Sequence, residues 1–172
     1  TLGCSKNKVD TEHILSQVED LYEIVPEGED IPVDVLLINT CGFIGDAKEE
    51  SVQTILEAVD RKNRGEVGKV VVFGCLSQRY SSDMPQLIPE VDAWFGARDF
   101  DPVIKELGAQ PDASKASSRF LTTPSHYAYL KISEGCDRRC SYCAIPFIRG
   151  GHKSVPMETL VEEARKLAER GV

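Results

Sequence analysis

The chain has 172 residues, of which 41% are hydrophobic, an ordinary share for a globular core. Its formal net charge of −8 argues against a general nucleic-acid binder. No apolar run approaches the length of a membrane span and no signal peptide is apparent, so the sequence predicts a cytoplasmic protein with no membrane partner.

Helical and strand-like segments alternate over the first part of the chain. Apolar spacing predicts a helix over 6–21, and a mostly apolar run at 33–39 predicts a strand buried on both faces. A long helix over 46–64 and a second buried strand at 69–73 follow. The remaining expected elements are short helical pieces at 77–80 and 85–88, a weaker strand at 92–96 and a short helix at 102–107. This order is typical of an α/β fold with an open parallel sheet flanked by helices.

A second unit follows a segment at 109–125 that is rich in Ala, Ser, Asp and Pro and is therefore predicted to be a linker. We expect a new strand at 127–132, then a cysteine-rich loop, then a helix that begins at Pro156. One such β-loop-α unit cannot bury a core alone, so the rest of its domain is expected beyond Val172. The chain is thus expected to be a fragment of a longer protein. The predicted division is a first domain at 1–108, a linker at 109–125 and an incomplete second domain at 126–172.

The loop of this second unit holds Cys136, Cys140 and Cys143 in the pattern Cys-x3-Cys-x2-Cys. Three thiolates this close in sequence can hold three irons of a four-iron cubane and leave the fourth iron open to a small molecule. A structural zinc site would want a fourth ligand at matching spacing, and the nearest histidine, His152, is nine residues further on. Disulfides would need an oxidising compartment, of which the sequence has no sign. The motif therefore favours iron–sulfur chemistry.

The other three cysteines, Cys4, Cys41 and Cys75, are far apart in sequence, yet each comes directly after a strand or the remnant of one. Because the carboxyl ends of parallel strands lie at one edge of a sheet, these cysteines are expected to converge and to hold a second cluster. The alternative is three separate core cysteines, which are common as small apolar residues. Each cysteine has a glycine beside it that would let the backbone approach a bulky cofactor: Gly3, Gly42 and Gly74.

Positive charges gather around the cysteine loop, with Glu134 and Asp137 among them. The favoured interpretation is a solvated loop. The functional interpretation is that these cations balance an anionic cluster or attract an acidic substrate. The cations are Lys131, Arg138, Arg139, Arg149 and Lys153.

Four stretches carry a resemblance to a known family. They are Leu-Gly-Cys-Ser-Lys-Asn-Lys-Val-Asp-Thr-Glu at 2–12, Ile-Asn-Thr-Cys-Gly-Phe-Ile at 38–44, Gly-Cys-Leu-Ser-Gln-Arg-Tyr at 74–80 and Tyr-Leu-Lys-Ile-Ser-Glu-Gly-Cys at 129–136. The cysteine triplet resembles the radical S-adenosylmethionine superfamily, and the order of all six cysteines resembles its methylthiotransferases. Gly-Cys-Ser-Lys-Asn and Asn-Thr-Cys-Gly resemble the branch that modifies an aspartate of a small-subunit ribosomal protein. The tRNA-modifying branch typically has Gly-Cys-Gln-Met-Asn and Asn-Thr-Cys-Ser there.

The resemblance implies two 4Fe–4S clusters and S-adenosylmethionine as cofactors. The cluster on Cys136, Cys140 and Cys143 would bind and split S-adenosylmethionine, and the resulting radical would take a hydrogen from the aspartate β-carbon. The cluster on the other three cysteines would supply a methylated sulfur. Tyr142 and Ile145 would flank the adenine, or would simply pack the loop. The implied partners are the ribosomal protein and a reductant protein.

Two other functions stay open from the sequence. One is methylthio transfer to an adenosine of tRNA, and the other is a non-catalytic iron–sulfur carrier, which has no need of an open iron. The family has a complete barrel after the cysteine loop and usually a further β-barrel. We therefore expect this chain to be inactive by itself.

Overall fold

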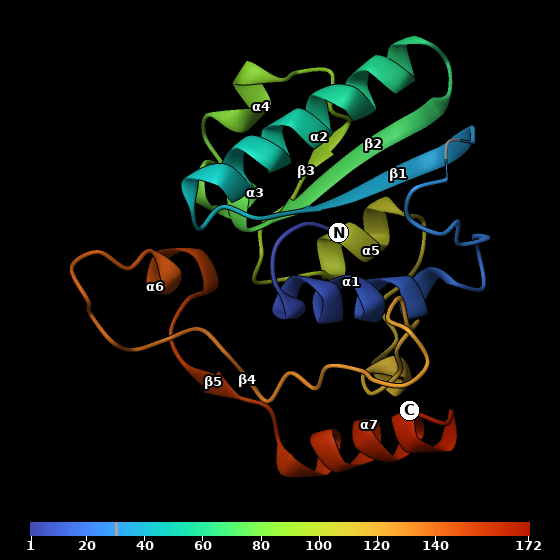
Figure 1. Cartoon of the computed structure of the whole chain (residues 1–172), viewed down its shortest axis with the longest axis vertical. Helices are drawn as coiled ribbons and strands as arrows, with labels where there is room; N and C mark the ends of the chain where they lie inside the picture. The colour runs from blue at the N-terminus through green and yellow to red at the C-terminus, as the bar shows by residue number, and fades with distance from the viewer. Residues whose placement is uncertain (30) are drawn as a thin grey trace.

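Three parallel strands form the centre of the fold in the computed structural model, which describes residues 1–29 and 31–172 (Figure 1). β1 (Val33–Thr40) pairs with β2 (Val67–Gly74), and β2 pairs in turn with β3 (Ala93–Trp94). The register aligns the last residues of the two long strands, Thr40 and Gly74. Whatever follows these two strands therefore leaves the sheet at the same edge.

Helices cover both faces of this sheet, because its strands are apolar on both sides. Val70 and Val72 of β2 pack with Ile55 of α2 (Gly45–Asn63) on one face. Val71 and Phe73 point the other way and pack against α1 (Ser5–Val18) and α5 (Asp101–Glu106). The structure thus confirms the predicted α/β class with an open parallel sheet between helices (Figure 1).

The smaller elements complete the chain. β4 (Ser133–Glu134) and β5 (Lys153–Ser154) pair as a short antiparallel hairpin, with the cysteine loop and α6 (Ile145–Arg149) between them. The short helices of the first unit are α3 (Cys75–Arg79) and α4 (Met84–Leu87). The elements of the second unit are η1 (Ala113–Lys115), β4 (Ser133–Glu134), α6 (Ile145–Arg149), β5 (Lys153–Ser154) and α7 (Met157–Glu169).

The predicted strand at 127–132 is wrong. This segment is extended but pairs with no strand among the described residues, and the ladder begins only at Ser133. The Ile132 carbonyl accepts one hydrogen bond, from the Val155 N–H at 3.0 Å. A strand needs a partner along its whole length, and an apolar sequence pattern cannot say whether one is present.

The segment at 109–125 lies along α1. The Phe120 N–H donates to the Glu12 carbonyl at 3.0 Å. The Arg119 guanidinium is buried between the carboxylates of Glu12 and Glu163, and it also donates to the Tyr129 carbonyl. This buried network fastens the segment at 109–125 and α7 to the first unit. The domain boundaries given above stay a prediction.

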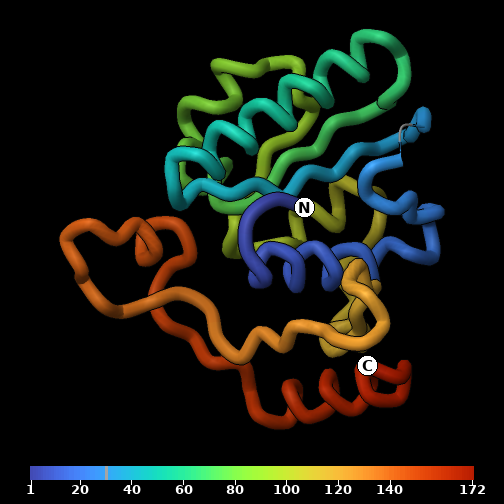
Figure 2. The backbone as a smooth tube through the Cα atoms, in the orientation of Figure 1, coloured from blue at the N-terminus to red at the C-terminus, as the bar shows by residue number. Residues whose placement is uncertain are grey.

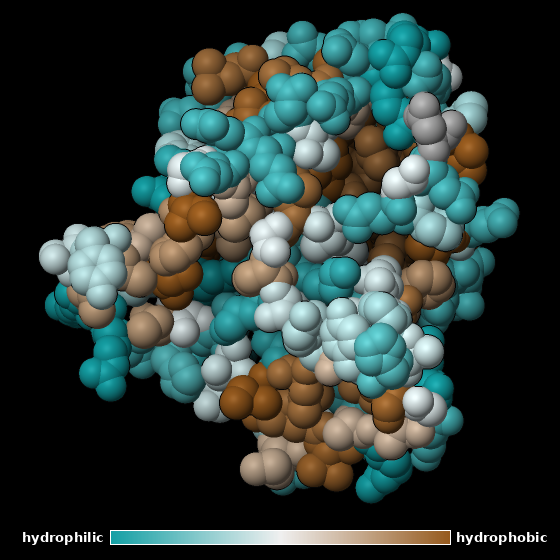
Figure 3. Space-filling model, in the orientation of Figure 1, coloured by the Kyte–Doolittle hydropathy of each residue, from teal (hydrophilic) through white to brown (hydrophobic). Residues whose placement is uncertain are grey.

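Apolar side chains are exposed on the second unit, at the end of the molecule that carries α7 (Figure 3). They include Ile132, Met157 and Val161, whose exposed fractions are 62%, 69% and 49%. The second unit therefore lacks the covering that a closed core would give it. Among the residues that the structure describes, no helix is both long enough and apolar enough to cross a bilayer.

Candidate metal centre

The three dispersed cysteines come together where the strands end. Cys41 directly follows β1, and Cys75 directly follows β2 and begins α3. Cys4 precedes α1, and the Leu2 N–H donates to the Asn39 carbonyl at 2.9 Å, which places the start of the chain beside the end of β1. The three segments meet at one edge of the sheet (Figure 2).

Asn7 lies among the three thiols. Its Oδ1 atom is 3.9 Å from Cys4 Sγ and 3.8 Å from Cys75 Sγ. Cys41 adjoins the same group, because a Cβ atom added to Gly3 would lie 3.0 Å from Cys41 Sγ and 3.2 Å from Asn7 Nδ2. Cys4 is exposed, Cys41 is half-buried and Cys75 is buried. The three thiols are therefore gathered around Asn7 at one partly exposed edge of the sheet, and they are not three separate core positions.

Glycines allow these turns to approach each other. A Cβ atom on Gly42 would lie 2.7 Å from the Cys75 carbonyl oxygen. Gly74 has φ +108°, and a Cβ atom there would lie 2.4 Å from Asn39 Oδ1 and 2.7 Å from the Thr40 carbonyl oxygen. The sequence predicted that these glycines make room for a cofactor. In the structure they make room for one another's cysteine-bearing turns, because any side chain would push the turns apart.

Buried amides and a hydroxyl hold the backbone around the thiols. Asn7 Nδ2 donates to the carbonyls of Leu2 and Thr40, at 2.9 and 3.1 Å. Asn39 Nδ2 donates to the Asn7 carbonyl at 2.8 Å. The Cys41 N–H donates to Ser51 Oγ of α2 at 2.9 Å. Both asparagines are almost fully buried, so they hold the segments that carry Cys4 and Cys41 in fixed positions.

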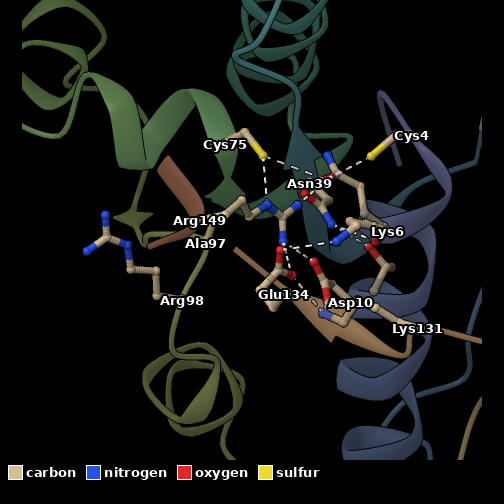
Figure 4. A network of polar contacts seen from close by, with 12 residues as sticks. Cys4, Lys6, Asp10, Asn39, Cys75, Ala97, Arg98, Lys131, Glu134 and Arg149 are labelled. Atoms are coloured by element: carbon tan, nitrogen blue, oxygen red, sulfur yellow. Dashed lines mark hydrogen bonds and ion pairs between the residues drawn. The ribbon is translucent and has the colours of Figure 1, made fainter. Parts of the chain in front are cut away.

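Arg149, the last residue of α6, reaches into this site from the second unit (Figure 4). Its Nε atom lies 3.2 Å from Cys75 Sγ, and its Nη2 atom donates to Asn7 Oδ1. Its Nη1 atom is 2.6 Å from Asp10 Oδ2 and 3.1 Å from Glu134 Oε2. Arg149 therefore touches one cysteine of the first set while it belongs to the helix that follows the second set.

Burial and charge act in opposite directions on these groups. Burial raises the pKa of the Cys75 thiol, and the Arg149 guanidinium opposes part of that rise. Burial alone would lower the pKa of Arg149, but Asp10, Cys75 and Glu134 outweigh it and raise that pKa. The pKa of Glu134 is lowered, because Arg149 and Lys131 outweigh the effect of its own burial. Arg149 thus stays charged beside the sulfur atoms.

The solvated-loop interpretation is wrong for two of the five cations. Arg149 is 6% exposed, and Lys131 pairs with Asp10 and, at 3.1 Å, with Glu134. Lys6 of α1 joins the same group, since its Nζ atom donates to the Ser133 carbonyl at 2.9 Å and lies 3.7 Å from Glu134. The sequence could not show these contacts because the partners lie far apart along the chain. The three exposed cations are Arg138, Arg139 and Lys153.

The second cysteine set lies on the loop between β4 and α6. Cys140 is exposed, and Cys136 and Cys143 are half-buried. The Cys136 N–H donates to the Gly150 carbonyl at 3.0 Å, and the Cys143 N–H donates to the Cys140 carbonyl at 3.1 Å, so the loop closes on itself. Tyr142 is 90% exposed. The half-buried Ile145 begins α6.

The two sets adjoin each other through α6. Ile148 is buried against Cys75 and Ala97, with Ala144 packed beside them. Arg98 Nε donates to the Ile148 carbonyl at 3.1 Å and holds α6 from its other side. The helix that follows the cysteine loop, α6, is therefore docked next to the edge where β1 and β2 end, and the loop itself extends away from that edge (Figures 1 and 2).

The chemistry of the donors fits an iron–sulfur cluster better than a single ion. Within the described parts of the chain, no three His, Cys, Asp or Glu side chains lie close enough together to hold one metal ion. A four-iron cubane binds each thiolate through a different iron, so its ligands surround a cluster. Cys4, Cys41 and Cys75 lie around Asn7, with the Arg149 guanidinium beside Cys75, and three such thiols would suit the irons of a cubane.

Sequence reasoning missed Asp10, named Arg149 only as one of five cations around the loop, and left Asn7 and Asn39 out of the site. A partial signal was present: Asn7 and Asp10 are three residues apart on α1 and so share a face. Arg149 was one of the noted cations, but nothing in the sequence separated it from its exposed neighbours.

Comparison with known proteins places the chain in a family. Residues 1–96, which contain the first cysteine set, match the uncharacterized protein family UPF0004. Similar curated proteins are each named ribosomal protein uS12 methylthiotransferase RimO. That of Porphyromonas gingivalis is 53% identical over 172 residues and covers 99% of this chain. Those of Christiangramia forsetii and Cytophaga hutchinsonii are 52% and 50% identical and cover 100% and 99%. The chain spans only 38 to 40% of these relatives. The chain belongs to the uncharacterized protein family UPF0004, and the predicted resemblance to the ribosomal-protein branch of the methylthiotransferases is confirmed.

Proposed function

We propose that this chain provides the sulfur-donor site and the first part of the radical site of an enzyme that adds a methylthio group to the β-carbon of an aspartate in ribosomal protein uS12. The observation that carries the proposal is the meeting of Cys4, Cys41 and Cys75 around Asn7, directly beside the helix that follows the second cysteine set. The names of relatives about 50% identical to the chain support the choice of substrate.

Each set of cysteines would hold one 4Fe–4S cluster. Cys136, Cys140 and Cys143 would hold the cluster to which S-adenosylmethionine binds, with Tyr142 and Ile145 near the adenine. When bound, the cofactors supply the radical and the sulfur chemistry. The residues of the chain supply position: Asn7 and Asn39 fix the cysteine-bearing backbone, and Arg149 holds a fixed charge beside Cys75.

A reductant protein would supply the electrons. The negative net charge fits a protein substrate better than tRNA, since a general nucleic-acid binder presents a basic surface. Work on a ribosomal protein with reduced cysteines would take place in the cytoplasm.

Iron content tests the two-cluster part of the proposal. Anaerobic reconstitution should give about eight irons per chain, which is two four-iron clusters. Cys4→Ala and Cys140→Ala should each remove about half of that iron, and the double variant should remove nearly all of it. Iron that never exceeds about four per chain, or a Cys4→Ala variant with the iron content of the parent, would contradict the proposal.

The substrate is tested separately. The sequence is expressed as part of a chain as long as its relatives, in cells that lack their own enzyme of this kind, and uS12 and tRNA are both analysed by mass spectrometry. We expect the methylthio mass on an aspartate of uS12, and a matched Cys75→Ala protein should give none. A methylthio mass on tRNA alone would establish the adenosine alternative. Clusters that assemble but do not respond spectroscopically to S-adenosylmethionine would establish the carrier alternative.

A further inference from the structure

The guanidinium of Arg149 connects three elements of the fold through its separate nitrogen atoms. Nε faces Cys75 Sγ at the start of α3, at 3.2 Å. Nη2 donates to Asn7 Oδ1, and Nη1 donates to Asp10 Oδ2, both on α1. Nη1 also donates to Glu134 Oε2 of β4 at 3.1 Å. All three nitrogens are thus engaged, which fixes the plane of the guanidinium and directs the Nε–H at the sulfur.

This contact links the two cysteine sets through a single side chain. Arg149 lies six residues after Cys143 and is the last residue of α6, the helix that follows the cysteine loop. Ile148, its neighbour, is buried against Cys75 and Ala97. A shift of the loop would therefore move the cation away from Cys75, and a shift of the Cys75 turn would pull on the helix behind the loop.

The local charge balance favours an anionic occupant at Cys75. Three cations, Lys6, Lys131 and Arg149, surround the carboxylates of Asp10 and Glu134, which leaves one positive charge in excess. Asp10 is buried and is matched by Lys131 as well as by Arg149. The guanidinium therefore retains an electrostatic attraction for a negative group on its Nε side, where the sulfur lies.

We propose that Arg149 is a positioning residue that couples the two cysteine sites, by docking the loop of Cys136, Cys140 and Cys143 against Cys75 and by donating a hydrogen bond to the Cys75 sulfur when that sulfur holds a cluster. The inference rests on the proposed function, since it requires a cluster on Cys4, Cys41 and Cys75. Hydrogen bonds and positive charge near cluster sulfurs stabilise the reduced, more negative form, so Arg149 raises the reduction potential of that cluster.

The test isolates the first cluster. In a parent protein with Cys136→Ala, Cys140→Ala and Cys143→Ala, only the site of Cys4, Cys41 and Cys75 can bind iron. The midpoint potential of its cluster is measured by spectroscopic redox titration. Arg149→Gln should shift the potential to lower values because the charge and the Nε–H are both lost. Arg149→Lys should shift it in the same direction by less, because lysine keeps a charge for Asp10 but has no Nε–H to face the sulfur.

Arg98→Gln is the matched control. Arg98 is another arginine against α6, but it donates to backbone carbonyls such as that of Ile148 and is not in contact with Cys75 through any hydrogen bond of the described residues. Its variant removes a support of α6 but leaves the hydrogen bonds that Arg149 itself makes to Cys75, Asp10 and Glu134, so its potential should match the parent. An equal shift in Arg98→Gln and Arg149→Gln would overturn the inference, since loosening alone would then explain both.

The remaining outcomes are also decisive. A parent that binds iron while Arg149→Gln has an unchanged potential would overturn the inference alone. A parent that binds no iron would overturn the proposed function together with the inference. If Arg149→Gln does not fold, as judged by circular dichroism, Arg149→Lys decides: a potential equal to that of the parent overturns the inference, and a lower one supports it.

Discussion

The two sets of cysteines are assembled in opposite ways. Cys4, Cys41 and Cys75 come from three separate turns and meet only because β1 and β2 end in register at one edge of the sheet. Cys136, Cys140 and Cys143 share one short loop, and two backbone hydrogen bonds within the β4–α6 segment close it. The first site depends on the whole fold, whereas the spacing of the second set is determined mostly by the local sequence.

This difference extends to the surroundings of each set. The first site has buried support from Asn7 and Asn39, whereas in the second the neighbour of the last cysteine, Tyr142, is 90% exposed. A site formed by tertiary structure needs its neighbours fixed, because any displacement of a strand moves a ligand. A site on one loop tolerates exposure, since its ligand spacing is set by the chain itself.

The largest expected effect concerns the junction between the two regions. Arg119→Ala would leave the carboxylates of Glu12 and Glu163 buried with fewer partners, although Thr122 would still donate to Glu12. Removing one member of a buried ion network typically costs about 3–5 kcal/mol. We expect a loss near the lower end of that range in the free energy of unfolding, measured by urea denaturation.

Arg165→Ala is the control for this prediction. Arg165 pairs with Glu162 on the same helix, but both side chains are largely exposed, so the loss should be too small to measure. If Arg119→Ala also left the free energy of unfolding unchanged, the second unit would not be fastened to the first through this network. The loop of the second cysteine set would then depend on the first unit even less than the contacts of Arg119 indicate.

The sequence could predict that the first set of cysteines meets because the rule behind that meeting is geometric. Parallel strands share an edge, so Cys41 and Cys75 had to approach each other once 33–39 and 69–73 were identified as strands. It could not predict Arg149, because that contact requires knowing where α6 docks. The failed strand at 127–132 has the same cause: the sequence carries the apolar pattern, but pairing depends on a neighbour far along the chain.

The second expected effect separates the two sites directly. Gly74 has φ +108° and ψ −157°, a region almost restricted to glycine, and an added Cβ would meet Asn39 Oδ1 at 2.4 Å. Gly74→Ala should cost about 2–3 kcal/mol in the free energy of unfolding. Because the turn carries Cys75, iron bound after reconstitution should fall by about half, to the one cluster of the loop.

Gly65→Ala distinguishes crowding from backbone strain. Gly65 also has a positive φ, +78°, but nothing lies within 4 Å of its added Cβ. This variant should cost about 1 kcal/mol and leave the iron content unchanged. A Gly74→Ala protein that lost the iron of both clusters would show that the loop site also depends on the sheet edge, and the two sites would not be independent.

The smallest expected effect concerns acid and the sheet that forms the first site. Asp92 Oδ2 accepts hydrogen bonds from the Val70 N–H of β2 at 2.7 Å and from Lys62 Nζ of α2 at 2.6 Å. Burial alone would raise the pKa of Asp92, but these contacts outweigh it and hold that pKa below the ordinary 3.8. The unfolded chain therefore binds the proton more readily, and the carboxylate stabilises the fold above about pH 4 and stops doing so as the pH falls through its lowered pKa.

Asp92→Asn should lower the free energy of unfolding at pH 6 by less than about 1 kcal/mol, because the ion pair is partly screened by solvent. It should also make that free energy fall less steeply between about pH 5 and about pH 3, as measured by urea denaturation at each pH. Asp34→Asn, an exposed position on β1, controls for the change in net charge. If Asp92→Asn lost stability in acid as steeply as the parent, Asp92 would not be a source of the acid sensitivity, and its bonds to β2 and α2 would not hold the sheet edge that carries Cys41 and Cys75.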